Sequence, residues 1–181
     1  MFRKEFKRGC MLVIGGARSG KSRFALDVCN GLGKERIFLA TGQALDREMA
    51  ERIRRHREER GDEWMTVEEP IKVAESIRDL DAEGRVILID CLTLWLNNLF
   101  LECHEDQEAI VRALSDLERQ LRTAQGAVVV VSNEVGMGIV PDNALSRRFR
   151  DTAGSANQRI AGIARKVVAI IAGTPLVLKD E

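Results

Sequence analysis

Residues 15–22 read GGARSGKS, a full match to the phosphate-binding loop pattern G-x-x-x-x-G-K-[ST]. The apolar run MLVI at residues 11–14 leads directly into it, and RFALDVCN at residues 23–30 can continue as a helix. In this pattern backbone N–H groups converge on the phosphates of a nucleotide, where the N-terminus of the helix also favours negative charge. A strand, a glycine-rich turn and a helix in this order therefore predict a nucleoside triphosphate site rather than a plain glycine-rich turn.

We expect the whole loop to contact the nucleotide. Lys21 places a point charge at the β and γ phosphates, so we assign it a catalytic role, and Ser22 offers a hydroxyl to a magnesium ion. Glycine is required where a Cβ atom would clash with the turning backbone. The expected nucleotide-binding residues of the loop are Gly15, Gly16, Ala17, Arg18, Ser19, Gly20, Lys21 and Ser22.

The composition is that of a soluble globular protein. The 181 residues predict one domain over residues 1–181, with residues 1–10 as a short N-terminal extension. The 28 basic and 28 acidic side chains cancel, which argues against a nucleic-acid binder because such a protein needs a basic excess. No long apolar run follows the basic start MFRKEFKR, so we expect neither a signal peptide nor a membrane span. The four cysteines form no C-x-x-C pair, and reduced thiols indicate the cytoplasm.

Short apolar runs alternate with helical patterns along the chain. The runs are nearly continuous in Val, Ile and Leu, which is typical of strands buried on both faces of a parallel sheet. Together with the phosphate loop, this alternation predicts an α/β P-loop NTPase (RecA-like) fold in three layers, with a mostly parallel central sheet. We expect strands at 11–14, 36–40, 85–90, 127–133 and 166–172, an edge strand at 175–180, and helices near 21–30, 46–60, 71–80, 106–124 and 144–164.

Ligands of such sheets bind beyond the carboxyl ends of the strands, so the residues that follow each strand are candidates. Asp90 ends the run VILID and can hold magnesium opposite Ser22, although an aspartate there can also be the N-cap of a helix that starts at Leu92. Residues 40–42, Ala-Thr-Gly, end the second strand and allow a ligand to approach the backbone, but they equally suit a plain turn.

The helix expected at 46–60 carries a histidine among arginines. Met49 and Ile53 share a face with His56 and can anchor that face on the domain. Nearby cations lower the pKa of a histidine and favour the neutral, nucleophilic imidazole, and they also attract a polyphosphate. From the residues alone, a solvated charged helix with an incidental histidine is slightly favoured.

Two further segments draw attention. Residues 133–143, NEVGMGIVPDN, follow an apolar strand and are too apolar for a solvated linker, so they either pack against a partner, cover a substrate or simply cross the sheet. Three arginines of the following helical stretch can bind phosphate, although a solvated face is the commoner role. These are Arg147, Arg150 and Arg159.

Together these motifs resemble one family closely, the bifunctional adenosylcobinamide kinase/adenosylcobinamide-phosphate guanylyltransferases of cobalamin biosynthesis. The phosphate loop is generic, but NEVGMGIVP followed by FRD-x-AG-x-x-NQ is specific to this family. The resemblance covers nearly all of the chain beyond the first ten residues. Its matching stretches are GGARSGKS, LATGQALDREMAERIRRHREER, VILIDCLTLWLNNL and SNEVGMGIVPDNALSRRFRDTAGSANQRIA.

The resemblance implies two reactions. A nucleoside triphosphate, ATP or GTP, phosphorylates the aminopropanol hydroxyl of adenosylcobinamide, and GTP then donates GMP to that phosphate with release of pyrophosphate. The second reaction runs through a GMP–histidine intermediate on the helix after the second strand, where His56 is the one histidine. Family members can carry two adjacent histidines there, whereas Arg55 precedes His56 in this chain. The kinase without guanylyl transfer and a RecA-like regulatory or motor module are the alternatives.

The resemblance also implies nucleotide contacts outside the phosphate loop and a homotrimer, with magnesium held by Ser22 and Asp90. Residues 94–100, LWLNNLF, suit a subunit contact, although a core helix explains them as well. The resemblance also implies that an acidic residue at or near Glu68 or Glu69 contacts the nucleotide. The implied nucleotide contacts are Ala40, Thr41, Gly42, Arg57, Glu58, Glu59, Arg60, Glu68 and Asp90.

Overall fold

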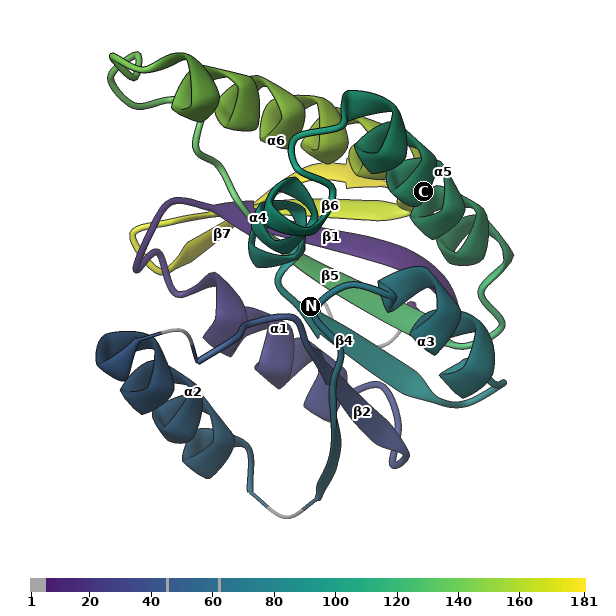
Figure 1. Ribbon diagram of the computed structural model, residues 1–181. Coiled ribbons are helices and arrows are strands. Elements are labelled where there is room, and N and C mark those ends of the chain that lie inside the picture. Colours follow the sequence, from purple (N-terminus) through teal and green to yellow (C-terminus); the bar gives the residue numbers. More distant parts are fainter. Residues whose placement is uncertain (1–5, 45, 62) are drawn as a thin grey trace.

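The computed structural model describes residues 6–44, 46–61 and 63–181; within helix α2, the side chains of residues 48, 52, 55, 56, 59 and 60 also lie outside the description. A central sheet separates two helical layers (Figure 1). The strands are β1 (Gly9–Gly15), β2 (Arg36–Ala40), β3 (Trp64–Glu68), β4 (Val86–Asp90), β5 (Ala127–Asn133), β6 (Lys166–Ile171) and β7 (Thr174–Asp180). The helices are α1 (Lys21–Asn30), α2 (Arg47–Arg60), α3 (Val73–Leu80), α4 (Leu92–Glu102), α5 (Gln107–Thr123) and α6 (Ala144–Ile163).

The described strands form one seven-stranded sheet in the order β3-β2-β4-β5-β1-β6-β7. All neighbouring pairs are parallel except β6 and β7, which form an antiparallel hairpin. The expected α/β fold with a mostly parallel sheet is therefore confirmed. The register sets the ends of the parallel strands side by side, because Ala40 pairs with both Glu68 and Asp90, and Gly15 pairs with Asn133.

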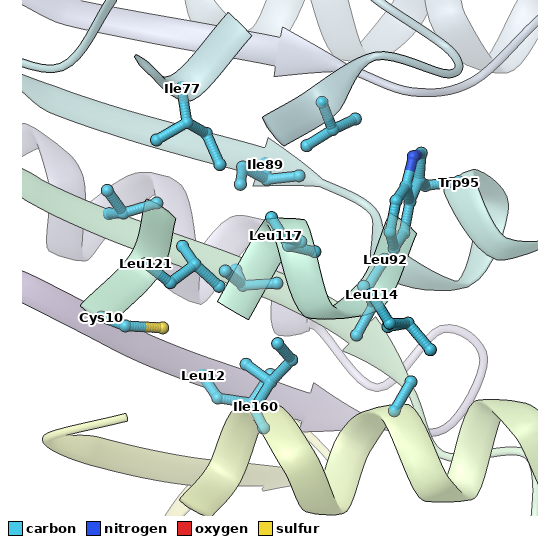
Figure 2. Close-up of a cluster of buried hydrophobic side chains, with 14 of the residues drawn as sticks. Cys10, Leu12, Ile77, Ile89, Leu92, Trp95, Leu114, Leu117, Leu121 and Ile160 are labelled. Carbon is cyan, nitrogen blue, oxygen red and sulfur yellow. The ribbon is translucent and has the colours of Figure 1, made fainter. Parts of the chain in front are cut away.

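Two hydrophobic clusters fill the space between the sheet and the helices. Successive side chains of a strand point to opposite faces, so Leu12 joins the cluster under α3 to α6 while Met11 and Val13 join the cluster under α1. Figure 2 shows the first cluster, in which side chains of four helices meet Leu12 and Ile89 of the sheet. Phe6 of the N-terminal extension is buried in the second cluster. This double cover explains why the central strands are almost wholly apolar.

Two elements differ from the expectation. Strand β3, WMTVE, was not expected because it is a half-exposed edge strand with polar residues, and it becomes a strand by pairing with β2. Helix α4, LTLWLNNLFLE, lacks a polar face because most of its side chains are buried, so it shows no helical periodicity. Of the two explanations of residues 94–100, the core helix is confirmed.

The cysteines are all reduced, and three are fully buried: Cys10, Cys29 and Cys91. Cys103 is half-buried. Burial raises the pKa of the Cys10 and Cys91 thiols to about 12 and also raises the pKa of Cys29, because a thiolate is poorly solvated in the core. These thiols are therefore unreactive core groups. Among the described residues, no helix combines the length and the apolar character needed to cross a membrane.

Candidate functional site

The phosphate loop joins the end of β1 to the start of α1. Gly20 has a φ of +94° and Arg18 a φ of +56°, so the backbone reverses direction before the helix begins. A Cβ atom on Gly15 would lie 2.6 Å from Ser19 Oγ and 2.7 Å from the carbonyl oxygen of Ile170, so only glycine fits there. Among the described residues, no side chain caps the first turn of α1, which leaves its N–H groups for an anion.

Lys21 lies inside the curve of this loop. Its side chain is buried, and its Nζ donates a hydrogen bond to the carbonyl oxygen of Gly16 at 3.1 Å. The loop is supported from both sides: the N–H of Glu134 donates to Gly15 at 3.0 Å, and the N–H of Gly173 donates to Ser19 at 3.0 Å. The charge of Lys21 is thus held at the point where the loop's N–H groups converge.

A cleft that is open to solvent lies at the carboxyl ends of the strands. Among the described residues, the polar and charged lining consists of Lys21, Ser22, Arg57, Thr66, Glu68, Asp90 and Asn133. The apolar lining consists of Phe38, Ala40, Met49, Ile53 and Leu94, with Gly42 and Cys91 between them.

The cleft brings together expected site residues from elements far apart in the chain. Lys21 and Ser22 come from the phosphate loop, Ala40 and Gly42 from the end of β2, Arg57 from α2, Glu68 from β3 and Asp90 from β4. The lining combines charged and apolar side chains, and a nucleotide needs both, for its polyphosphate and for its flat base.

Helix α2 borders the cleft with one face. The Ile53 Cδ1 atom lies 3.8 Å from the position that a Cβ atom on Gly42 would take, so the helix packs closely on the turn after β2. Met49, Ile53 and Arg57 all line the cleft, which confirms the expected anchoring by Met49 and Ile53. His56 belongs to α2 beside Arg57, but its side chain, like those of Glu59 and Arg60, lies outside the described residues.

Two expected contacts have other partners. The Thr41 side chain is fully buried: its hydroxyl donates to the Cys91 carbonyl at 2.8 Å and accepts from the Cys91 N–H at 2.7 Å. Thr41 thus ties the end of β2 to the end of β4. Glu58 forms an ion pair with Arg54; both side chains are exposed, and neither is among the residues that line the cleft.

Ser22 and Asp90 fit a magnesium ion by their chemistry. Both are oxygen donors lining the same cleft as Lys21, and magnesium usually takes one or two protein oxygens together with the substrate's phosphates. The alternative role of Asp90 is wrong, because the N-cap residue of α4 is Cys91 and no side chain bonds to the helix start. Among the described residues, no group of three or more His, Cys, Asp or Glu side chains forms a separate metal site.

A buried polar network fixes Asn133, which follows an apolar strand at the edge where site residues gather and which lines the cleft. Thr93 Oγ1 accepts from the Asn133 N–H at 2.8 Å, and Asn157 Nδ2 donates to the Asn133 carbonyl at 3.2 Å. Ser132 Oγ bridges them, donating to Asn157 Oδ1 at 2.6 Å and lying 3.3 Å from Thr93 Oγ1. Side chains from α4 and α6 therefore hold both backbone polar groups of Asn133.

Helix α4 also holds the ends of β2 and β3. Asn98 Nδ2 donates to the carbonyl oxygens of Thr41 at 2.7 Å and Pro70 at 3.1 Å. Trp95 Nε1 donates to the carbonyl oxygen of Ile71 at 2.8 Å. These bonds tie α4 to the segments that follow β2 and β3, two neighbouring strands that contribute to the cleft, so α4 supports the site.

The three arginines of α6 bind neighbouring groups of the protein. Arg147 donates to the carbonyl oxygens of Pro141 and Asp142, Arg150 pairs with Asp151, and Arg159 pairs with Glu118. None of them lines the cleft. Their described contacts are thus structural, and all three arginines are partly buried, so they do not form the solvated face expected as their commoner role.

Comparisons with known proteins point to one family. Residues 11–178 match the family described as cobinamide kinase / cobinamide phosphate guanyltransferase. The chain is 43% identical to the bifunctional adenosylcobalamin biosynthesis protein CobP of Pseudomonas aeruginosa, over 94% of this chain and 97% of that protein. It is 38% identical to the bifunctional adenosylcobalamin biosynthesis protein CobU of Escherichia coli, over 93% and 99% respectively.

Solved structures that resemble this chain share its fold at low sequence identity. The flagellar accessory protein FlaH of Methanocaldococcus jannaschii has a TM-score of 0.54 and 11% identity, covering 96% of this chain and 79% of that chain. The RadB recombinase has a TM-score of 0.51 and 16% identity, covering 89% and 73%. They confirm the RecA-like P-loop NTPase fold. A shared fold does not determine the activity, which has to be argued from the residues of the cleft.

Proposed function

The chain belongs to the cobinamide kinase / cobinamide phosphate guanyltransferase family of cobalamin biosynthesis, and we propose that it carries out both reactions in one nucleotide cleft. The first phosphorylates adenosylcobinamide with ATP or GTP, and the second joins GMP from GTP to the phosphate just formed. One observation carries this proposal: the cleft has the phosphate loop on one side and helix α2, which carries His56, on the other. A nucleotide held by its phosphates is then within reach of both elements.

In the kinase step, the aminopropanol hydroxyl oxygen attacks the γ phosphorus, the bond to the β–γ bridging oxygen breaks, and the hydroxyl proton passes to solvent. Lys21 and the N–H groups of the phosphate loop stabilise the charge that develops on the transferred and leaving phosphates. Ser22 and Asp90 would hold magnesium, which when bound neutralises phosphate charge. The Asn133 carboxamide lies in the same cleft and can donate to a phosphate oxygen.

In the guanylyl transfer step, a nitrogen of His56 attacks the α phosphorus of GTP and pyrophosphate leaves. An oxygen of adenosylcobinamide phosphate then attacks the same phosphorus, the nitrogen–phosphorus bond breaks, and adenosylcobinamide-GDP forms. Arg57 follows His56 on α2 and lines the cleft, so its guanidinium can stabilise the departing pyrophosphate. The apolar lining residues Phe38 and Leu94 suit the flat face of a base, and Glu68 can accept from its N–H groups.

The test is a labelling experiment with GTP that carries a radioactive α phosphate. The wild-type protein is expected to retain label that is stable to alkali and lost in acid, as a phosphoramidate is. His56→Ala should carry no label yet still transfer a γ phosphate to adenosylcobinamide. The matched control is His104→Ala, at the turn after α4, which should label normally. Persistent label in His56→Ala, or its loss in His104→Ala, contradicts the assignment.

We further propose a single-domain cytoplasmic enzyme that assembles as a homotrimer. The one continuous sheet supports a single domain, and the four reduced cysteines suit a reducing compartment. The trimer rests on the family resemblance alone. Sedimentation velocity of the purified protein tests it, and a monomer at micromolar concentration would contradict it.

A further inference from the structure

The loop between β5 and α6 exposes apolar side chains at the catalytic edge of the sheet. Met137 is 91% exposed, Ile139 97% and Val140 63%. Single exposed apolar residues are ordinary on a protein surface, but here three lie within four residues of one loop, and clustered exposed apolar side chains mark binding sites. We call residues 137–140 the loop tip.

Both ends of this loop are fixed to the domain. On the β5 side, the Glu134 N–H bonds to Gly15, the Glu134 carboxylate accepts from the Gly136 N–H at 2.8 Å, and Val135 packs against the core. On the α6 side, Arg147 donates to the carbonyl oxygens of Pro141 and Asp142. Among the described residues, the backbone groups of the loop tip itself form no hydrogen bonds. The tip is thus held out on a fixed base with its own donors and acceptors available.

The base of the loop touches the phosphate loop. Gly15 and Asn133 are paired in register, and Asn133 lines the nucleotide cleft. The loop and the start of α6 extend beyond the sheet on the side opposite α2 (Figure 1). In the kinase step the acceptor hydroxyl must come within about 3–3.5 Å of the terminal phosphate. The rest of the acceptor must then lie near the carboxyl ends of the strands. Helix α2 already borders the nucleotide there, so the loop on the opposite side of the sheet is the one available to the acceptor.

We propose that the loop tip binds the corrinoid body of the acceptor, an inference that rests on the proposed function. A corrinoid is a broad ring with apolar ring carbons and methyl groups, surrounded by amide side chains. Met137, Ile139 and Val140 offer an apolar surface for the ring, and the free N–H and C=O groups of the tip can bond to the amides. The fixed base keeps this surface in constant relation to the phosphate loop, so the loop tip sets the position of the acceptor.

The test compares Ile139→Ser and Met137→Ser with Val111→Ser, a control on α5 whose side chain is also exposed. Adenosylcobinamide binding is measured by equilibrium dialysis, and γ-phosphate transfer gives KM values for acceptor and nucleotide. The bound acceptor would bury the Ile139 side chain, so losing this contact in Ile139→Ser should raise the acceptor Kd and KM about tenfold or more. The nucleotide KM should stay within about twofold, because the tip does not line the nucleotide cleft. Val111→Ser should match the wild type in both.

The outcomes separate this inference from the proposed function. If the wild type fails to phosphorylate adenosylcobinamide, the proposed function fails. If the wild type is active but the acceptor constants of both loop variants are unchanged, the loop tip does not bind the acceptor. An equal rise in the nucleotide KM also overturns the inference. So does a changed sedimentation coefficient with an unchanged acceptor KM, since the patch would then contact a second copy of the chain.

Discussion

Asn98 offers a quantitative test of how the site is held together. Its side-chain amide donates to two carbonyl oxygens, of Thr41 and Pro70, and the residue is buried on α4. Asn98→Ala leaves both carbonyls without this partner. An unsatisfied buried polar group costs about 1–3 kcal/mol. The hydrogen bond to the Pro70 carbonyl is partly exposed, so losing it should cost about 1 kcal/mol, the lower end of this range. For both bonds together, we expect the free energy of unfolding to fall by about 2–4 kcal/mol.

Urea and thermal unfolding of Asn98→Ala measure this loss directly. For a chain of this size, 1 kcal/mol corresponds to a change of about 2–4 °C in Tm, so a fall of roughly 5–15 °C is expected. The adjacent Asn97 is a matched control because it has the same side chain on the same helix but is exposed. Asn97→Ala should change the unfolding free energy by no more than about 0.5 kcal/mol. Equal stability of the two variants would show that α4 does not support the strand ends through Asn98.

Four shorter predictions concern other parts of the molecule. Gly15→Ala should abolish the increase in Tm on adding GTP, because its methyl group would lie 2.6 Å from Ser19 Oγ; a wild-type increase would contradict this. Asn157→Leu removes a support of Asn133 and should lower kcat for phosphoryl transfer at least about tenfold, whereas the exposed neighbour variant Gln158→Leu should not. Iodoacetamide should alkylate only Cys103 in the folded protein, as counted by mass spectrometry. Because the buried thiols keep their protons in the fold but ionise near pH 9.0 when unfolded, stability should fall from about pH 9 towards pH 12 in urea unfolding.

Local patterns were enough to predict most of the fold. The runs around Val13, Ile87 and Val130 are buried on both faces of the sheet, and their continuous apolar character is a direct result of that burial. Strand β3 could not be predicted in this way, and helix α4 was reached only as one of two explanations of residues 94–100. The first depends on pairing with β2, and the second is buried on nearly all sides.

The candidate site shows the same division. Lys21, Ser22 and Asp90 were predicted because each belongs to a motif contained in a few consecutive residues, and the structure brings them to one cleft. The fixing of Asn133 was not predicted, because its partners Thr93 and Asn157 lie 40 and 24 residues away in the chain. No local pattern records such a contact. It arises only when α4 and α6 pack on the same face of the sheet.

The antiparallel β7 decides how this protein can be attached to a surface. In the turn before β7, the Gly173 N–H donates to Ser19 of the phosphate loop. The strand then runs back to the opposite end of the sheet's strands, where Asp180 pairs with Lys166 and the Glu181 N–H donates to the Arg165 carbonyl. A linker placed after Glu181 would therefore leave the catalytic edge facing the solution. A fluorophore on the β6–β7 turn would instead sit beside the nucleotide's phosphates and could follow their arrival and departure in real time.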